Sequence, residues 1–182
     1  MKLSLSTPDL LSQLQTVTRV ASTRSAIQAL SGVKISAPEG LRPELLATDA
    51  EIGLRVPLSS ANVDRPGDAV LPARLLTDVV RTLPADTLTL ELRSAEQDVE
   101  LVCGSATFHL RMLRAEDFPA LPEPSPDTRT TLPVAAFVQT VSQVARSASR
   151  DETRPVLTGI LMSASEQTLR MVATDSYRLS VK

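Results

Sequence analysis

Three segments carry the apolar spacing of an amphipathic helix, two of them at i, i+1, i+4, i+7 and one at i, i+1, i+4, with the polar positions gathered on the opposite face. They begin near Pro8, Pro72 and Pro133. A proline in the first helical turn is harmless, because its missing N–H has no partner there in any helix. The pattern therefore predicts three helices, whose apolar positions are Leu10, Leu11, Leu14 and Val17; Leu75, Leu76 and Val79; and Phe137, Val138, Val141 and Val144.

Shorter segments between these helices alternate apolar and polar residues, as strands with one buried face do. Residues 32–36 and 44–48 predict a hairpin, and residues 51–58 predict a further strand. Residues 88–92, 99–103 and 106–112 predict an antiparallel meander. The chain is thus expected to have an α+β fold in which each unit combines strand, helix and several antiparallel strands.

The chain also repeats itself, which is the strongest guide to its organisation. Residues 29–36 (ALSGVKIS) match residues 156–163 (VLTGILMS) at an offset of 127 (159 − 32), and LATD at 46–49 matches VATD at 172–175 at an offset of 126 (175 − 49). The three helix-initiating prolines are separated by 64 (72 − 8) and 61 (133 − 72) residues. A shorter repeat of 61–64 residues therefore lies within a longer repeat of 126–127 residues. This predicts repeated helix-plus-antiparallel-sheet units.

Proline content marks the boundary between the repeats. Residues 117–126 hold four prolines without any apolar period, which is typical of an extended interdomain linker. We expect a first domain at residues 1–122, a Pro-rich linker at 123–129, and the first half of a second domain at 130–182. By this repeat, the sequence resembles a fragment of a longer protein.

Composition narrows the function classes. No apolar run approaches the roughly 20 residues that span a bilayer, and no signal-peptide core follows Met1, so we expect a soluble, unexported protein. A lone Cys103 and a lone His109 make neither an internal disulfide nor a structural zinc site. Six glycines form no phosphate-binding loop, so neither metal nor cofactor is expected. The formal charge of −2 gives no global basic field for nucleic acid.

The polar helix faces nevertheless carry hydroxyls, amides and arginines, with Asp9 as the acidic residue. Such faces suit a phosphate backbone, where contacts carry no sequence information. Ordinary solvated faces are the alternative, and spacing alone leaves both interpretations open. The residues are Ser12, Thr16 and Arg19; Arg74, Thr77 and Arg81; and Gln139, Gln143 and Arg146.

Two Thr-Asp pairs raise a catalytic alternative, a small hydrolase with Asp49 or Asp175 as base. Equivalent positions in tandem domains normally lie a domain's width apart, so strand-end hydrogen bonding is the simpler interpretation. Cys103, with no basic neighbour in sequence, is expected to be a small packed residue. A sequence-specific DNA-binding module that uses the arginine-bearing helices is a further alternative.

Three motifs resemble a known family: RPVLTGIL at 154–161, VATDSYRL at 172–179 and DFPALP at 117–122. They are similar to bacterial DNA sliding clamps, the β subunit of DNA polymerase III. The resemblance implies a clamp fold with helices lining a hole and sheets outside, and head-to-tail homodimers around duplex DNA. It implies a non-catalytic processivity factor of a DNA-directed DNA polymerase (a nucleotidyltransferase), acting in DNA replication in the bacterial cytoplasm. The implied partners are duplex DNA, the polymerase III catalytic subunit, the clamp loader, other polymerases and mismatch-repair proteins, with no membrane.

The resemblance also assigns residues. Together with the helix-face arginines, the expected DNA-binding set is Arg19, Arg24, Arg74, Arg81, Arg146, Arg150 and Arg154. The expected pocket for a hydrophobic partner peptide is formed by Leu157, Thr174, Ser176, Tyr177, Arg178 and Leu179. Ser176 and Tyr177 depart from the Gly and His usual in the family, which puts the pocket's shape in doubt. Phe108 and Leu110 resemble the edge strand at the dimer interface, with His109 on the opposite face.

Overall fold

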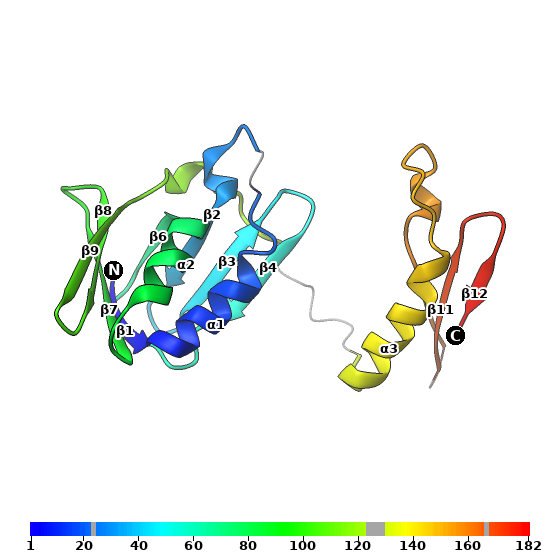
Figure 1. Ribbon diagram of the computed structural model, residues 1–182, viewed down its shortest axis with the longest axis horizontal. Coiled ribbons are helices and arrows are strands. Elements are labelled where there is room, and N and C mark those ends of the chain that lie inside the picture. The colour runs from blue at the N-terminus through cyan, green and yellow to red at the C-terminus, as the bar shows by residue number, and fades with distance from the viewer. Residues whose placement is uncertain (23–24, 123–129, 166–167) are drawn as a thin grey trace. The chain divides into compact units, whose positions relative to one another are not determined.

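The computed structural model describes residues 1–22, 25–122, 130–165 and 168–182. The chain divides into two compact units, Met1–Glu123 (unit 1) and Pro124–Lys182 (unit 2) (Figure 1). In the described residues, no helix is both long and apolar enough to cross a bilayer.

Unit 1 combines two α-helices with two antiparallel sheets. Its helices are α1 (Thr7–Val17) and α2 (Ala73–Thr82), with short 3-10 helices η1 (Gln28–Ser31) and η2 (Ala115–Asp117). One sheet has the strand order β5-β1-β7-β8-β9 and the other β4-β3-β2-β6. The strands are β1 (Lys2–Ser6), β2 (Gly32–Ala37), β3 (Glu44–Thr48), β4 (Gly53–Pro57), β5 (Asn62–Arg65), β6 (Gly67–Pro72), β7 (Thr87–Arg93), β8 (Asp98–Cys103) and β9 (Ala106–Arg111).

The predicted helices, hairpin and meander are confirmed. β2 pairs with β3 in antiparallel register, and β7, β8 and β9 follow one another as a meander. The strand expected at 51–58 begins only at Gly53, because a tight turn occupies the preceding residues. The hydrophobic pattern did not locate β1, β5 or β6.

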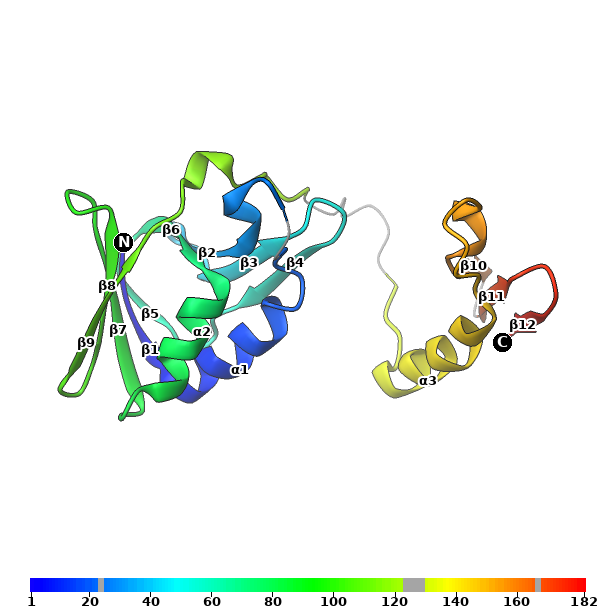
Figure 2. The same ribbon diagram turned by 45° about the horizontal axis from the view of Figure 1, so that its top comes forward.

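The two halves of unit 1 exchange their first strands. β1 leads into α1 but pairs with β7, and β6 leads into α2 but pairs with β2. Helices α1 and α2 lie side by side in the middle of this arrangement (Figure 2). Each half therefore completes the sheet of the other.

The core lies between the helices and the sheets. Leu10, Leu14 and Leu76 are fully buried in it. The predicted apolar face of α2 was wrong at Leu75, which is 48% exposed, whereas Val80 is buried. The buried face of α2 runs through Ala73, Leu76, Thr77 and Val80 at three- and four-residue spacing, so its phase differs from the predicted one by one position. Cys103 is fully buried, as predicted.

The extended linker predicted at 117–126 was wrong for its first half. The chain turns in η2, Phe118 is 9% exposed in a small cluster, and Leu121 packs against that cluster. An Nη2 donor of Arg55 also binds the carbonyl oxygen of Leu121 at 2.9 Å. Two apolar side chains three residues apart thus fasten this segment to unit 1, whereas residues 123–126 lie outside the described residues.

The described part of unit 2 repeats the order of α-helix, 3-10 segment and three strands that runs from α1 to β4 in unit 1. Its sheet has the order β10-β11-β12, and its small core is built on Val144, Met171 and Ala173. Its elements are α3 (Val134–Val144), η3 (Ala145–Ser147), η4 (Pro155–Leu157), β10 (Leu161–Ser165), β11 (Thr168–Thr174) and β12 (Leu179–Val181).

Candidate nucleic-acid interface

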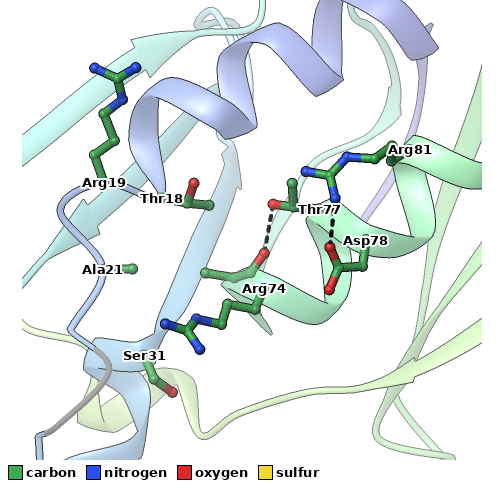
Figure 3. Close-up of a pocket in the computed structure, with 9 residues that line it drawn as sticks. Thr18, Arg19, Ala21, Ser31, Arg74, Thr77, Asp78 and Arg81 are labelled. Atoms are coloured by element: carbon green, nitrogen blue, oxygen red, sulfur yellow. Dashed lines mark hydrogen bonds and ion pairs between the residues drawn. The ribbon is translucent and has the colours of Figure 1, made fainter.

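An arginine-rich cleft lies where the end of α1 faces α2. It brings together Arg19, Arg74 and Arg81 of the predicted DNA-binding set (Figure 3). Its lining residues are Thr18, Arg19, Ala21, Ser31, Ala73, Arg74, Thr77, Asp78 and Arg81. The predicted Arg24 lies outside the described residues.

Two features of this cleft differ from the predicted polar face. Thr77 is 7% exposed and donates its hydroxyl to the carbonyl oxygen of Ala73 at 2.8 Å, so it is part of the core edge. Asp78, which is not among the predicted polar-face residues, accepts a hydrogen bond from Nη1 of Arg81 at 3.0 Å. The signal that could have found it is an Asp three residues before an Arg within one helix.

The cleft is positive because its lining residues carry three guanidinium groups and one carboxylate. Within the described residues, Arg19 and Arg74 form no ion pair, and the side chain of Arg74 extends toward Ser31 (Figure 3). In a chain of formal charge −2 this is a local reversal of sign. Donors arranged in this way can contact phosphate oxygens without reading bases.

A second arginine-rich cleft occurs in unit 2, after the end of α3. Arg146 is the repeat equivalent of Arg19 (146 − 19 = 127), and the cleft joins it to the predicted Arg150 and Arg154. It is lined by Ala145, Arg146, Ala148, Ser149, Arg150, Asp151, Arg154, Asp175, Tyr177 and Arg178. Tyr177 and Arg178, predicted for the peptide pocket, therefore line the same cleft as the predicted DNA-binding arginines.

Ion pairs hold part of this second cleft in place. Nε of Arg154 lies 3.0 Å from Oδ2 of Asp151, and its Nη1 donates to Oγ of Ser176 at 3.2 Å. The hydroxyl and backbone N–H of Thr153, then the Arg154 guanidinium, hold the pKa of Asp151 below its usual value. The Arg154 contact ties the predicted DNA-binding residues directly to the turn of the predicted peptide pocket.

The first Thr-Asp pair builds a tight turn at the end of β3. The Oδ1 atom of Asp49 accepts the backbone N–H groups of Glu51 at 2.9 Å and Ile52 at 2.7 Å. Oγ1 of Thr48 accepts the N–H of Ala50 at 3.0 Å. The N–H groups of Ile52 and Glu51 lower the pKa of Asp49.

The second Thr-Asp pair repeats this turn at the end of β11. Oδ1 of Asp175 accepts the N–H groups of Tyr177 and Arg178, each at 3.0 Å, and Oδ2 accepts Nε of Arg178 at 2.9 Å. The N–H of Arg178, supported by that of Tyr177 and by the guanidinium, lowers the pKa of Asp175. The lowered pKa values and the occupied Oδ1 atoms make both carboxylates poor general bases, which favours the hydrogen-bonding interpretation over the hydrolase.

Both turns also place a residue in the left-handed backbone region. Ala50 has φ 79° and Ser176 has φ 78°. This conformation favours glycine and costs an L-residue about 1–2 kcal/mol. The strain therefore occurs at Ser176, where the resemblance leads one to expect glycine.

Leu157, Thr174 and Leu179, also predicted for the pocket, do not line the arginine-rich cleft. Leu157 and Thr174 are half-buried, and Leu179 is 65% exposed at the start of β12. Strand alternation alone would place either Arg178 or its neighbours Tyr177 and Leu179 toward the core, but all three side chains are exposed. Tyr177 is 96% exposed because it belongs to the turn, before β12 begins.

The predicted interface residues lie on β9, an edge strand of the five-stranded sheet. Phe108 is 36% exposed, but Leu110 is 5% exposed and belongs to the core. Its side chain cannot contact a partner, so only its backbone remains for strand addition. His109 faces solvent, with Nδ1 3.7 Å from Oδ2 of Asp98.

Comparison with known proteins supplies the family. Residues 1–122 match the model for the N-terminal domain of the DNA polymerase III beta subunit, and residues 131–182 match the model for its central domain. A beta sliding clamp of Micrococcus luteus is 37% identical over 90% of this chain and 51% of that protein. One of Streptomyces coelicolor is 35% identical over 87% of this chain and 41% of that protein.

Solved structures agree with these matches. The DNA polymerase sliding clamp of Bacillus subtilis superposes with a TM-score of 0.91 at 28% identity, over all of this chain and 49% of that one. A sliding clamp of Bartonella birtlesii bound to griselimycin gives 0.85 at 28% identity, again over the whole chain and 49% of the other. The chain thus spans about half the length of the relatives it matches. It belongs to the DNA polymerase III beta subunit family, the bacterial sliding clamps.

Proposed function

We propose that the chain contributes the first domain and part of the second domain of a sliding clamp that holds a replicative polymerase on duplex DNA. The observation that carries this proposal is the pair of arginine-rich clefts, one after α1 and one after α3, which share the repeat-equivalent residues Arg19 and Arg146, in a chain of this family. Encircling of DNA by a closed ring belongs to the proposal for the whole protein. The site of action is proposed to be the bacterial cytoplasm.

The proposed contact is electrostatic. Arginine donors neutralise phosphates and release counterions, so affinity falls with salt, with a slope of about −0.9 per phosphate contact. Arg74, without an ion pair in the described part of the chain, contributes a full contact, whereas Arg81 is shared with Asp78. Because no bases are read, affinity should be indifferent to DNA sequence.

Duplex binding across a salt series tests this role. Arg74→Ala is expected to reduce the slope of log K against log salt by about 0.9. Arg42→Ala removes an exposed arginine outside the cleft and serves as the matched control. Equal slopes for Arg74→Ala and the wild-type chain would refute the proposed role, and strong discrimination between duplex sequences would favour the sequence-specific module instead.

The second part of the proposal is a partner site at the Thr174–Leu179 turn and Leu157, for apolar peptides of polymerases, the clamp loader and repair proteins. The related clamp from Bartonella birtlesii is bound to griselimycin, which supplies a probe. Tyr177 is 96% exposed, so Tyr177→Ala should weaken griselimycin binding without unfolding unit 2. Glu51→Ala changes the repeat-equivalent position of unit 1 (177 − 51 = 126) and should leave binding unchanged. If the two variants bind griselimycin with equal affinity, the partner site lies elsewhere.

The third part concerns assembly and chemistry. Edge strand β9, with Phe108 half-exposed, is proposed to pair with another subunit of the whole protein, through backbone hydrogen bonds at Leu110. The clamp is proposed to be non-catalytic, since both candidate carboxylates serve as turn acceptors. Turnover that is lost on Asp175→Ala, with the fold intact, would reopen the hydrolase alternative.

A further inference from the structure

The cleft between α1 and α2 contains a carboxylate that phosphate binding does not require. Asp78 is exposed on α2, and among the described residues that line this cleft it is the only acidic one. Its charge repels phosphate oxygens, whereas the charges of Arg19, Arg74 and Arg81 attract them. The cleft therefore exerts opposite effects on the same ligand.

The carboxylate holds one of the three guanidinium groups. Nη1 of Arg81 donates to Oδ1 of Asp78 at 3.0 Å, and Figure 3 shows the Arg81 side chain turned toward Asp78. Both side chains remain open to solvent, with 56% of the Arg81 side chain and 67% of the Asp78 side chain exposed. A phosphate that enters the cleft can therefore reach Arg81 and compete with the carboxylate.

The helix itself does not need this ion pair. An exposed ion pair on a helix surface contributes little to stability, and aspartate is a poor helix former. At the repeat offset of 61, the corresponding positions of α3 hold the uncharged residues Gln139 (139 − 78 = 61) and Ser142 (142 − 81 = 61). A helix of this type thus forms without the pair, so the cleft explains the pair better than the fold does.

A carboxylate also holds an arginine in the second arginine-rich cleft. Nε of Arg154 lies 3.0 Å from Oδ2 of Asp151, which again precedes its arginine by three residues. This pair follows α3 at an offset of 73 (151 − 78) from the first pair, so the repeat of 61 residues did not carry it there. Both clefts therefore have this feature independently of the repeat.

We propose that Asp78 limits the strength of the phosphate contact in the first cleft, because it competes with the DNA backbone for the guanidinium of Arg81. Arg74 provides a constant contact, whereas Arg81 exchanges between Asp78 and a phosphate. Each exchange replaces one charge-assisted hydrogen bond by another, so little free energy is lost when the duplex moves past the cleft. Such a contact favours movement along DNA over a fixed position. This inference rests on the proposed DNA-binding role of the cleft.

Duplex binding by the 182-residue chain across a salt series tests the role of Asp78. Asp78→Asn keeps the shape of the side chain and removes its charge, so Arg81 becomes free to contact a phosphate. The plot of log K against log salt should become steeper by up to about 0.9, which corresponds to one phosphate contact. Between about 50 and 200 mM salt, this variant should lose about three-fold more affinity than the wild-type chain loses. Asp78→Glu keeps the charge and should retain the wild-type slope.

Two controls separate the local ion pair from a general change of charge. Glu39→Gln removes the same charge from an exposed residue between β2 and β3, outside the cleft, and should leave the slope unchanged. In an Arg81→Ala background, Asp78→Asn should no longer make the slope steeper, because no guanidinium is left to be released. Circular dichroism melts of Asp78→Asn should match those of the wild-type chain, since Asp78 is exposed.

The results distinguish failure of this inference from failure of the proposed DNA-binding role. If Arg74→Ala lowers the slope but Asp78→Asn leaves it unchanged, the cleft binds DNA and the role assigned to Asp78 is wrong. If neither variant changes the slope, the proposed role of the cleft fails, and the role of Asp78 fails with it. Equal steepening by Asp78→Asn and Glu39→Gln would also overturn the inference, since net charge alone would then explain the effect.

Discussion

Replacing Ala50 by glycine should stabilise unit 1, because Ala50 holds a left-handed backbone with φ 79°. An L-residue there costs about 1–2 kcal/mol. Glycine has more conformational freedom in the unfolded chain, and losing it on folding offsets about 0.5–1 kcal/mol of the relief. Ala50 is exposed, so no packing is lost, and its N–H keeps the acceptor Oγ1 of Thr48 at 3.0 Å. The expected net gain is about 0.5–1 kcal/mol, or about 2–4 °C in Tm.

Thermal and urea unfolding, followed by circular dichroism, measure this gain. Gly40→Ala is the reverse substitution at a comparable position, since Gly40 has φ 71° and an added Cβ would meet no atom within 4 Å. It should lower stability by a similar amount, for the same backbone reason. If Ala50→Gly fails to raise Tm while Gly40→Ala lowers it, the strain assigned to the Thr48–Asp49 turn is wrong.

Three further results are expected. Ser176→Gly should stabilise unit 2 through the same backbone relief (φ 78°), seen as slower amide exchange in β11, and unchanged exchange would contradict it. Phe118→Ala should cost unit 1 about 3 kcal/mol in urea unfolding, since a buried phenyl ring is lost, against less than about 0.5 kcal/mol for Leu41→Ala at an exposed site. The Arg93 guanidinium lowers the pKa of Asp98, so its stabilisation is present above the unfolded-state pKa and is lost as pH falls through the folded one. Asp98→Asn should therefore be less stable than the wild-type chain at neutral pH but equal to it in strong acid, and a constant difference across a pH series of melts would refute this.

The helices could be predicted because their apolar spacing and initial prolines are local signals. Strands β1 and β6 could not, because each is held by a strand far away in sequence, and Pro72 at the end of β6 reads as a helix start. Leu75 shows a second limit. Adjacent leucines define an apolar stripe only to within one position, and tertiary packing decides which of them is buried.

The site residues could be predicted where residue type alone determines the charge. They could not be predicted where contacts in the folded chain determine which groups are paired. The arginines of both clefts follow from sequence, because their charge does not depend on packing. Asp78 and Asp151 were not predicted, although each precedes its arginine partner by three residues. The position of Tyr177 could not be predicted, because it lies in a turn whose length is set by the hydrogen bonds of Asp175.

The exchange of strands between the halves of unit 1 sets the order of events on the ribosome. Among the elements of unit 1, β1 is synthesised first, yet β7, one of the two strands that it pairs with, ends at Arg93. At about 5–20 residues per second, the nascent chain waits on the order of ten seconds before that pairing can form. During this interval Leu3 and Leu5, both buried in the finished unit, are exposed to chaperones and to neighbouring nascent chains. Folding of unit 1 is therefore timed by the synthesis of its second half.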